Sequence, residues 1–259
     1  MGILIQCLKA KYWTTQFNPW IGCKQCSPAC EHCYAAAMTK RFGGSFEPHR
    51  SKQTKPPAKG VCFCGNMTDC FGEWVERDEA GEWIAHCILN CKKPVTYLWL
   101  TKRPDRITDA VHYVSDRMKR AEVLFANNYF GFTAENQELW WKRRNRLDLP
   151  HSVKWWASLE PLLGPIDMGL TFRHPVTGAF GILPERELPS WVVVGCESGP
   201  NRRPCKIEWV ESIAQQCVDA NIPLFVKQLD INGRCETDIN KFPEHLRIRQ
   251  VPWAKKESV

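Results

Sequence analysis

Four cysteines fall within eleven residues of the sequence, at Cys23, Cys26, Cys30 and Cys33. The surrounding stretch, 18–34, contains Gly and Pro and has no hydrophobic period, so we predict a loop, followed by a helix over 35–42. A loop can fold back on itself and point several thiolates at one centre, which a helix or a strand cannot do. The stretch therefore predicts a metal site, and thiolates are ligands of both zinc and iron–sulfur clusters.

The spacing within the loop separates two kinds of metal site. Cys26, Cys30 and Cys33 are separated by three and two residues, which resembles the radical S-adenosylmethionine (SAM) enzymes. In that superfamily three thiolates hold a [4Fe–4S] cluster, and the fourth iron binds SAM, which is cleaved to a 5′-deoxyadenosyl radical. The alternative is a structural Zn site that uses all four cysteines as two Cys-x2-Cys pairs. Only three residues separate these pairs, far fewer than the usual gap of about 12–20.

The whole chain sets the context for this loop. Its 259 residues, 44% of them hydrophobic, fit one large α/β domain. The sequence shows no signal peptide and no apolar run long enough for a membrane span, so we expect a soluble, cytoplasmic protein. Fourteen cysteines without a secretion signal then indicate reduced thiols and metal. The cysteines in or beside apolar runs are expected to be buried: Cys7, Cys62, Cys196, Cys217 and Cys235.

Short apolar runs alternate with amphipathic segments along the rest of the chain. Six runs are predicted as strands: 60–64, 95–100, 129–132, 153–157, 191–194 and 223–226. Helices are predicted over 74–91, over a segment with Ile107, Val111, Val114 and Met118 on one face, over 135–147 and over 207–218. This alternation predicts a parallel sheet and a full or partial (β/α) barrel. An inserted loop or hairpin is expected near 164–190.

Polar side chains follow every predicted strand. In barrels the carboxyl ends of the strands carry the functional site, so their recurrence favours a shared site over ordinary polar loops. The residues concerned are Asn66, Asp69, Lys102, Arg103, Glu135, Asn136, Glu160, Glu197, Ser198, Lys227 and Gln228.

Several blocks of the chain, in order, resemble the phage Gp37/Gp68 family, a radical-SAM-like group similar to the spore photoproduct lyases. The resemblance extends from about Trp13 to Gln228 and implies a TIM-like barrel of the radical SAM type. On this basis we expect a barrel over 1–229, with the cluster loop at 18–34, and a C-terminal extension over 230–259. The matching blocks are Phe17–Cys23, Ser27–Ala35, Asn66–Asp69, Leu100–Pro104, Glu135–Gln137, Glu160–Asp167, Trp191–Pro200 and Phe225–Gln228.

The resemblance also implies roles for residues. The family spacing selects Cys23 with Cys30 and Cys33, whereas the ordinary radical-SAM spacing selects Cys26 with the same pair. By analogy, Asn66, Thr68 and Asp69 would hold the SAM amino group. The remaining predicted cofactor or substrate contacts are Glu160, Glu197, Ser198, Lys102, Arg103 and Lys227, with ion pairs between strand ends as the alternative.

The function expected is that of a radical SAM enzyme that abstracts a hydrogen atom from DNA, RNA or a nucleotide and needs an electron donor. The +7 formal charge is compatible with such an anionic partner. The phage resemblance would place the protein in the host cytoplasm. Stacking faces are offered by Trp140 and Trp141, and by Trp155 and Trp156, although the helix–sheet core is the favoured place for the last two. The alternative function is a non-catalytic zinc or iron–sulfur protein that binds nucleic acid or a protein partner.

Four further cysteines leave a second metal centre open. Cys64, Cys70, Cys87 and Cys91 could hold one, but Cys87 and Cys91 are at helix spacing. We therefore expect Cys87 and Cys91 to be buried rather than to bind metal.

Overall fold

The computed structural model describes residues 10–90, 93, 95–118, 125–173 and 177–253. Within these ranges the chain folds as a mixed α/β structure around one eight-stranded sheet. None of the helices in these ranges is long and apolar enough to cross a membrane.

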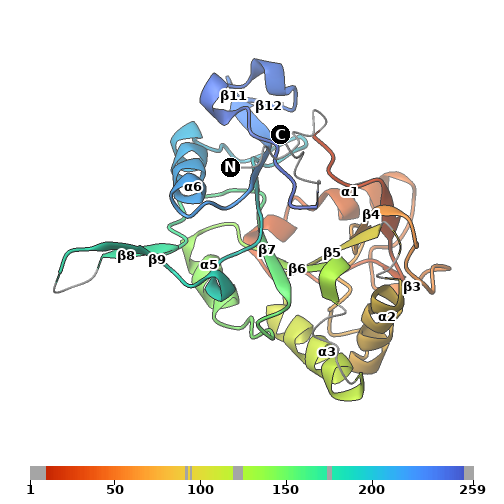
Figure 1. Cartoon of the computed structure of the whole chain (residues 1–259). Helices are drawn as coiled ribbons and strands as arrows, with labels where there is room; N and C mark the ends of the chain where they lie inside the picture. The colour runs from red at the N-terminus through yellow and green to blue at the C-terminus, as the bar shows by residue number, and fades with distance from the viewer. Residues whose placement is uncertain (1–9, 91–92, 94, 119–124, 174–176, 254–259) are drawn as a thin grey trace.

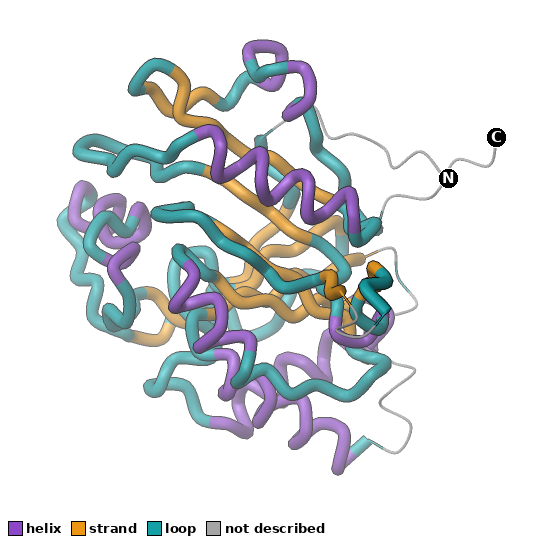
Figure 2. Tube along the Cα trace, turned by 90° about the vertical axis from the view of Figure 1, so that its left-hand side faces the viewer, coloured by secondary structure: helices purple, strands orange, loops and turns teal. Residues whose placement is uncertain are grey.

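The main sheet is curled into a half-barrel (Figures 1 and 2). Seven of its strands pair in parallel, and β12 pairs with β11 in antiparallel fashion. The carboxyl ends of the parallel strands therefore meet at one rim. The sheet order is β1 (Thr15–Phe17), β4 (Gly60–Cys64), β5 (Val95–Thr101), β6 (Asn128–Thr133), β7 (Lys154–Leu159), β10 (Val192–Gly195), β11 (Leu224–Ile231) and β12 (Arg234–Glu236).

All six strands predicted from the sequence are present: β4, β5, β6, β7, β10 and β11. The prediction missed β1 and β12, which complete the two edges of the sheet. Both are only three residues long, and β1 has a single buried side chain, Phe17. So short a segment has no period that a sequence pattern could reveal.

The predicted helices are present with different bounds: α1 (Tyr34–Arg41), α2 (Arg77–Leu89), α3 (Pro104–Arg117), α5 (Gln137–Arg144) and α6 (Ile207–Asp219). α5 begins two residues later than predicted because Asn136 is its N-cap, and its Oδ1 accepts from Leu139 N at 3.0 Å. Glu135 is thereby left outside the helix. α2 ends at Leu89, and Cys91 lies outside the described residues, as does Cys7.

The outer face of the sheet is covered by α2, α3, α5 and α6 (Figure 1). Strand residues such as Cys62, Trp99 and Val194 pack there against Ile84 and Val210 from the helices. The predicted burial is confirmed for Cys62, Cys87, Cys196 and Cys217, whereas Cys235 is half-buried. Cys64 and Cys70, for which no burial was predicted, are buried as well.

Aromatic rings fill the concave face towards the amino ends of the strands. The Tyr12 ring lies 4.9 Å from Trp191 and 5.2 Å from Phe225, between the first and last parallel strands. On β6, Gly131 leaves room for Trp156, because a Cβ there would lie 2.5 Å from the indole ring. These rings form a floor that closes the lower part of the half-barrel.

The core position expected for Trp155 and Trp156 is confirmed, and the stacking role is wrong for Trp140. Trp140, Trp155 and Trp156 are at most 5% exposed, because they pack in the core on either side of the sheet. Trp141 alone of this group has a large exposed fraction, 43%.

The insertion expected near 164–190 is a hairpin that projects from the body (Figure 1). It consists of β8 (Thr171–Arg173) and β9 (Phe180–Ile182), in antiparallel register. At the C-terminal end, β11 continues through residue 230 to Ile231. The chain then returns along β11, where Val226 N donates to Ile248 O at 2.8 Å.

Candidate metal centre

Residues 22–33, which we call the cysteine loop, connect β2 (Trp20–Ile21) to α1. Its start is fixed against the segment that follows β4: Gly22 N donates to Met67 O at 3.1 Å, and Thr68 Oγ1 donates to Gly22 O at 2.8 Å. Only glycine fits at position 22, because φ is +91° and a Cβ would lie 2.4 Å from Phe46 O. The loop therefore leaves the sheet in one defined direction.

Cys30 is the thiol most surrounded by hydrogen-bond donors. Its Sγ lies 3.5 Å from Cys26 N, 3.5 Å from Lys102 Nζ and 3.6 Å from Ser27 Oγ. The hydrogen bond from the Cys26 thiol lowers the pKa of Cys30 most, burial opposes this, and Lys102 lowers it further, to about 4. Cys30 is therefore a thiolate at neutral pH, which is the form that binds metal.

The other three thiols differ in their surroundings. Burial raises the pKa of Cys23 to about 12, with further contributions from Asp69, Cys30 and Cys33, so Cys23 is within electrostatic range of both other thiols of its proposed set. Cys26 is exposed, whereas Cys23, Cys30 and Cys33 are half-buried. Among the described residues no three His, Cys, Asp or Glu side chains already form a ligand set. The thiols must therefore turn towards a common point to bind a metal.

The residues that follow β5 and β6 hold the middle of the loop. Lys102 Nζ lies 2.8 Å from Glu135 Oε1 and donates to Ser27 Oγ at 2.8 Å. Ser27 Oγ donates to the same Glu135 oxygen at 2.6 Å, and Arg143 Nη1 lies 2.7 Å from the other one. Burial alone would raise the pKa of Glu135, but Lys102 and Arg143 lower it below its ordinary value. A fully buried carboxylate thus fixes the lysine that contacts Cys30.

The residues that follow β4 and β5 hold the start of the loop. Arg103 Nη1 lies 3.1 Å from Asp69 Oδ2, and its Nη2 donates to Lys24 O at 3.3 Å. Asp69 is 5% exposed and also accepts from Thr101 Oγ1 at 2.7 Å. All these groups contact protein atoms, so Asp69 and Arg103 position the loop.

The end of the loop is held from the other side of the rim, by residues that follow β10. Glu197 is 4% exposed and accepts from Arg203 N at 2.8 Å and from Arg203 Nε at 3.0 Å. His32 Nδ1 lies 2.9 Å from Glu197 Oε2, and Arg203 Nη1 donates to Pro28 O at 3.1 Å. Residues that follow four strands, β4, β5, β6 and β10, therefore contact one loop.

A polar ledge lies on the concave face above the aromatic floor. Lys227 Nζ lies 2.9 Å from Glu160 Oε1, and Glu160 is 12% exposed. Gly195 leaves room for this carboxylate, because a Cβ there would lie 2.9 Å from Glu160 Oε1. Partial burial raises the pKa of Tyr34, and nearby Cys33 and Glu160 add to this, although the side chain as a whole is 52% exposed. The Tyr34 hydroxyl donates to Asn66 O.

The predicted cofactor contacts therefore lie in different places. Glu160 belongs to the ledge, together with Lys227. Asn66 meets Tyr34 through its backbone O, and its side-chain amide pairs with Asn18 and Gln16. Thr68, Asp69, Lys102 and Glu197 contact the cysteine loop or the residues that hold it. Ser198 is exposed, and no contact of its side chain is found among the described residues.

Sequence reasoning missed four residues that contact or position the loop: Ser27, His32, Tyr34 and Arg203. Ser27 and His32 lie between the cysteines and Tyr34 directly after them, so their position within the loop was the available signal. Arg203 lies in an irregular segment, six residues after Glu197, where no period indicates its direction.

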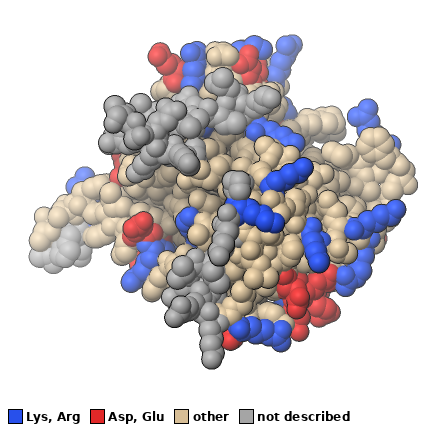
Figure 3. Space-filling view, turned by 45° about the vertical axis from the view of Figure 1, so that its right-hand side comes forward, with Lys and Arg blue, Asp and Glu red and all other residues tan. Residues whose placement is uncertain are grey.

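Charges on the surface are unevenly distributed. On the face that Figure 3 shows, Lys and Arg side chains are spread widely. Asp and Glu side chains form a larger group at the lower right and smaller groups at the top and left.

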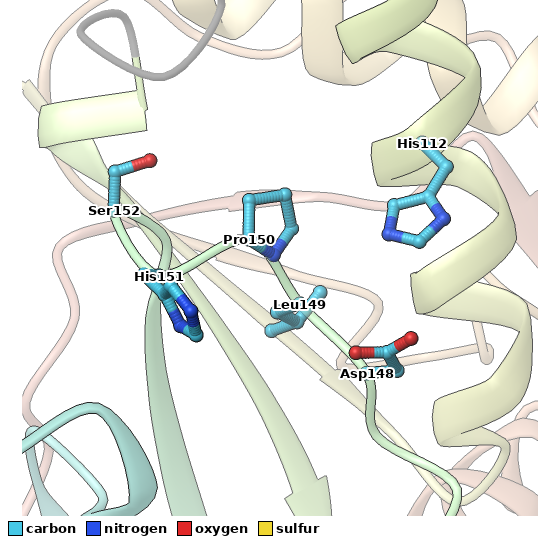
Figure 4. A pocket seen from close by; sticks show the side chains of 6 residues that line it. All are labelled: His112, Asp148, Leu149, Pro150, His151 and Ser152. Carbon is cyan, nitrogen blue, oxygen red and sulfur yellow. The ribbon is translucent and has the colours of Figure 1, made fainter. Parts of the chain in front are cut away.

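A cavity of about 370 Å³ lies at the opposite end of the sheet from the cysteine loop. It is lined by residues that precede β7 and by His112 from the second half of α3. His112 and His151 lie on opposite sides of Pro150 and do not converge (Figure 4). This cavity therefore offers no ligand set.

Comparison with known proteins gives one match. Residues 9–244 match the model of a family described as a protein of unknown function, DUF5131. No curated protein and no solved structure matches the chain.

Proposed function

We infer the function of this chain from its site, because the chain belongs to the DUF5131 family and the description of that family assigns none. We propose a radical SAM-type iron–sulfur enzyme that acts on nucleic acid or a nucleotide, built on a partial barrel of the radical SAM type. The reaction needs reduced thiols and an electron donor, so we place the protein in the cytoplasm.

One observation carries this proposal. A loop with four cysteines lies across the carboxyl ends of parallel strands and is contacted by residues that follow β4, β5, β6 and β10. Catalytic sites of (β/α) barrels are built at that end of the strands. A metal held there would face the concave ledge instead of the outer solvent.

The cysteines fit an iron–sulfur cluster. Cys30 has the thiolate character that a metal ligand needs. We propose Cys23, Cys30 and Cys33 as the ligand set, because Cys23 is within electrostatic range of both others and Cys26 is the exposed member. These three thiolates would hold a [4Fe–4S] cluster with one iron free of protein ligands, and that iron would supply the binding and one-electron reduction of SAM.

The protein's own residues would position and shield the reactants. Lys102 and Ser27 fix the orientation of Cys30 through their contacts with its Sγ. Glu160 and Lys227 present a carboxylate and an ammonium group to the concave space, which suits the charged ends of an amino acid. The aromatic floor below them excludes water from that side.

The second candidate is a non-catalytic zinc protein that binds nucleic acid or a protein partner. It is favoured by the hydrogen bond between the Cys26 and Cys30 thiols, which links the two Cys-x2-Cys pairs. In that case all four cysteines would be ligands.

Anaerobic reconstitution with iron and sulfide separates the two functions. The radical SAM proposal expects brown protein with broad visible absorbance that releases 5′-deoxyadenosine from SAM once dithionite is added. Colourless protein that binds one equivalent of zinc and never cleaves SAM would overturn it.

The third ligand is tested by replacing Cys23 and Cys26 singly with Ala. We expect Cys23→Ala to lose the cluster absorbance and Cys26→Ala to retain it, and each variant is the control for the other. The reverse result would assign Cys26.

A further inference from the structure

A second cavity, of about 240 Å³, lies between the N-terminal end of α3 and α5 and borders Cys26. Its lining is dominated by basic side chains, which come from the end of β5, from α3 and from α5 and its C-terminal end. They are Lys102, Arg103, Arg106, Lys142, Arg143 and Arg146.

Part of this positive charge is neutralised within the protein. Arg103 is paired with Asp69 and Glu73, and Lys102 and Arg143 share Glu135. One further carboxylate in the lining, Asp105, is exposed. Counting the Cys30 thiolate beside Lys102, six cations are matched by five anionic groups, so the pocket keeps a net positive charge.

The uncompensated charge is located at the mouth of the pocket. Arg106 donates to the backbone oxygens of Gly72 and Val75, which are neutral acceptors. Lys142 and Arg146 are exposed, and in the described part of the chain neither has an ion-pair partner. The N-terminal end of α3, a 14-residue helix that begins at Pro104 in the lining, adds the partial positive charge of its helix dipole.

We propose that this pocket binds a phosphate group of the substrate, so that the substrate of the cysteine-loop site is a phosphate ester held beside Cys26. That the bound molecule is a substrate rests on the proposed function. The phosphate site itself is inferred from the pocket alone. Buried ion pairs prearrange Arg103 and Arg143, while Lys142 and Arg146 are free to bind an anion without breaking an existing pair. The shared ligand chemistry is a phosphodiester of single-stranded nucleic acid or the phosphate of a mononucleotide.

The test measures binding of a fluorescein-labelled 12-nucleotide oligothymidylate by anisotropy, with thymidine monophosphate and inorganic phosphate as competitors. The variant is the pair Lys142→Gln and Arg146→Gln. The matched control is Lys52→Gln and Lys55→Gln, which removes the same charge from exposed lysines outside the pocket. All four side chains are exposed, so both variants should fold.

We expect the pocket variant to bind the oligonucleotide about tenfold more weakly. The slope of log affinity against log salt should fall by about 0.7 for each phosphate that the variant no longer neutralises. The control should stay within about twofold of the unmodified protein, since nonspecific attraction alone depends on total charge. Weak competition by the monophosphate identifies a nucleic acid backbone, and strong competition identifies a nucleotide; either supports the site.

Equal affinities of the pocket variant and the control, or no binding by the unmodified protein, would overturn the phosphate site. This failure is distinguishable from failure of the proposed function, because the binding assay does not require SAM cleavage. If the protein cleaves SAM but the two variants bind equally, only the phosphate site is contradicted. If the protein binds phosphate at the pocket but holds zinc, only the radical SAM function is contradicted.

Discussion

The pair of Glu197 and Arg203 combines a buried carboxylate with a guanidinium that is 28% exposed. Burial alone would raise the pKa of Glu197, but the hydrogen bonds from Arg203 and His32 outweigh it and lower this pKa to about 2. The pair therefore stabilises the fold above the ordinary glutamate pKa of about 4.5, and this contribution is lost as the pH falls towards 2.

Arg203→Ala should lower the free energy of unfolding at pH 7 by about 2–3 kcal/mol. That is less than the cost of breaking a fully buried pair, because Arg203 is partly exposed. Urea denaturation at pH 7 and at pH 3 measures the effect, which should be smaller at the lower pH. Arg186→Ala, which breaks an exposed pair with Glu187, is the control and should cost less than about 1 kcal/mol. Equal effects of the two variants would contradict the role assigned to Arg203.

Cys235 is the second thiol with a lowered pKa. A hydrogen bond from the Cys196 thiol lowers it most, burial opposes, and Arg202 and Lys227 lower it further, to about 7. Alkylation of Cys235 by iodoacetamide should therefore rise with pH and reach half its maximal rate near pH 7, as peptide mass spectrometry would show.

Cys196→Ala is the control for this titration. Without the donor thiol, the midpoint for Cys235 should move up towards the ordinary value of 9.0. An unchanged midpoint would show that the nearby cations alone determine the reactivity of Cys235.

At this scale, sequence reasoning located the four cysteines and most polar residues at the strand ends. It could not tell which of those residues contact the cysteine loop and which face the concave space. Asp69 and Asn66 are three residues apart, yet the Asp69 carboxylate pairs with Arg103 whereas the Asn66 amide pairs with Asn18 and Gln16. The direction of each side chain depends on the turn after β4, for which a single sequence carries no period.

At the scale of secondary structure elements, Gly131 on β6 leaves room for the Trp156 ring of the neighbouring strand β7. Gly131→Ala should lower the free energy of unfolding by about 1–3 kcal/mol, because the new methyl group would lie 2.5 Å from the buried Trp156 ring. Thermal denaturation measures this change.

Gly164→Ala is the matched control, since the nearest atom to its Cβ would be Asn136 Cβ at 3.8 Å. It should change the stability by less than about 0.5 kcal/mol. A Gly131→Ala protein as stable as this control would mean that Trp156 can move aside without cost.

The central strands and helices were predictable because each contains enough apolar residues in sequence to show a continuous run or a helical period. β5 and β10 are buried on both faces, and α3 and α6 repeat apolar residues on one side. β1 and β12 were not predictable, because three-residue edge strands depend on the neighbour with which they pair. Nor did periodicity predict how far the sheet curls, since that depends on the rings that fill its concave face.

In the whole molecule, the cysteine loop carries an exposed trypsin site at Lys24, whose carbonyl accepts from Arg103. Metal binding should slow cleavage after Lys24, because it joins the thiols on both sides of that residue to one centre. Timed digestion of metal-free and metal-loaded protein measures this.

Cleavage after Lys241 is the internal control, since this exposed lysine pairs with Glu236 far along the chain from the cysteine loop. Its rate should be the same in both preparations. Protection of both sites would indicate global stabilisation, and protection of neither would contradict metal binding at the loop.

A sheet that curls without closing keeps one easy deformation, a change in its curvature. Arg103, which follows β5, donates a hydrogen bond to Lys24 O of the loop, and Arg203, which follows β10, donates one to Pro28 O. The cysteine loop thus connects the two sides of the curled sheet, and its length limits how far β5 and β10 can move apart at the rim. A metal that brings the thiols together would shorten the loop and narrow the space above the ledge. Loading of the loop and the fit of a molecule on the ledge are therefore mechanically coupled.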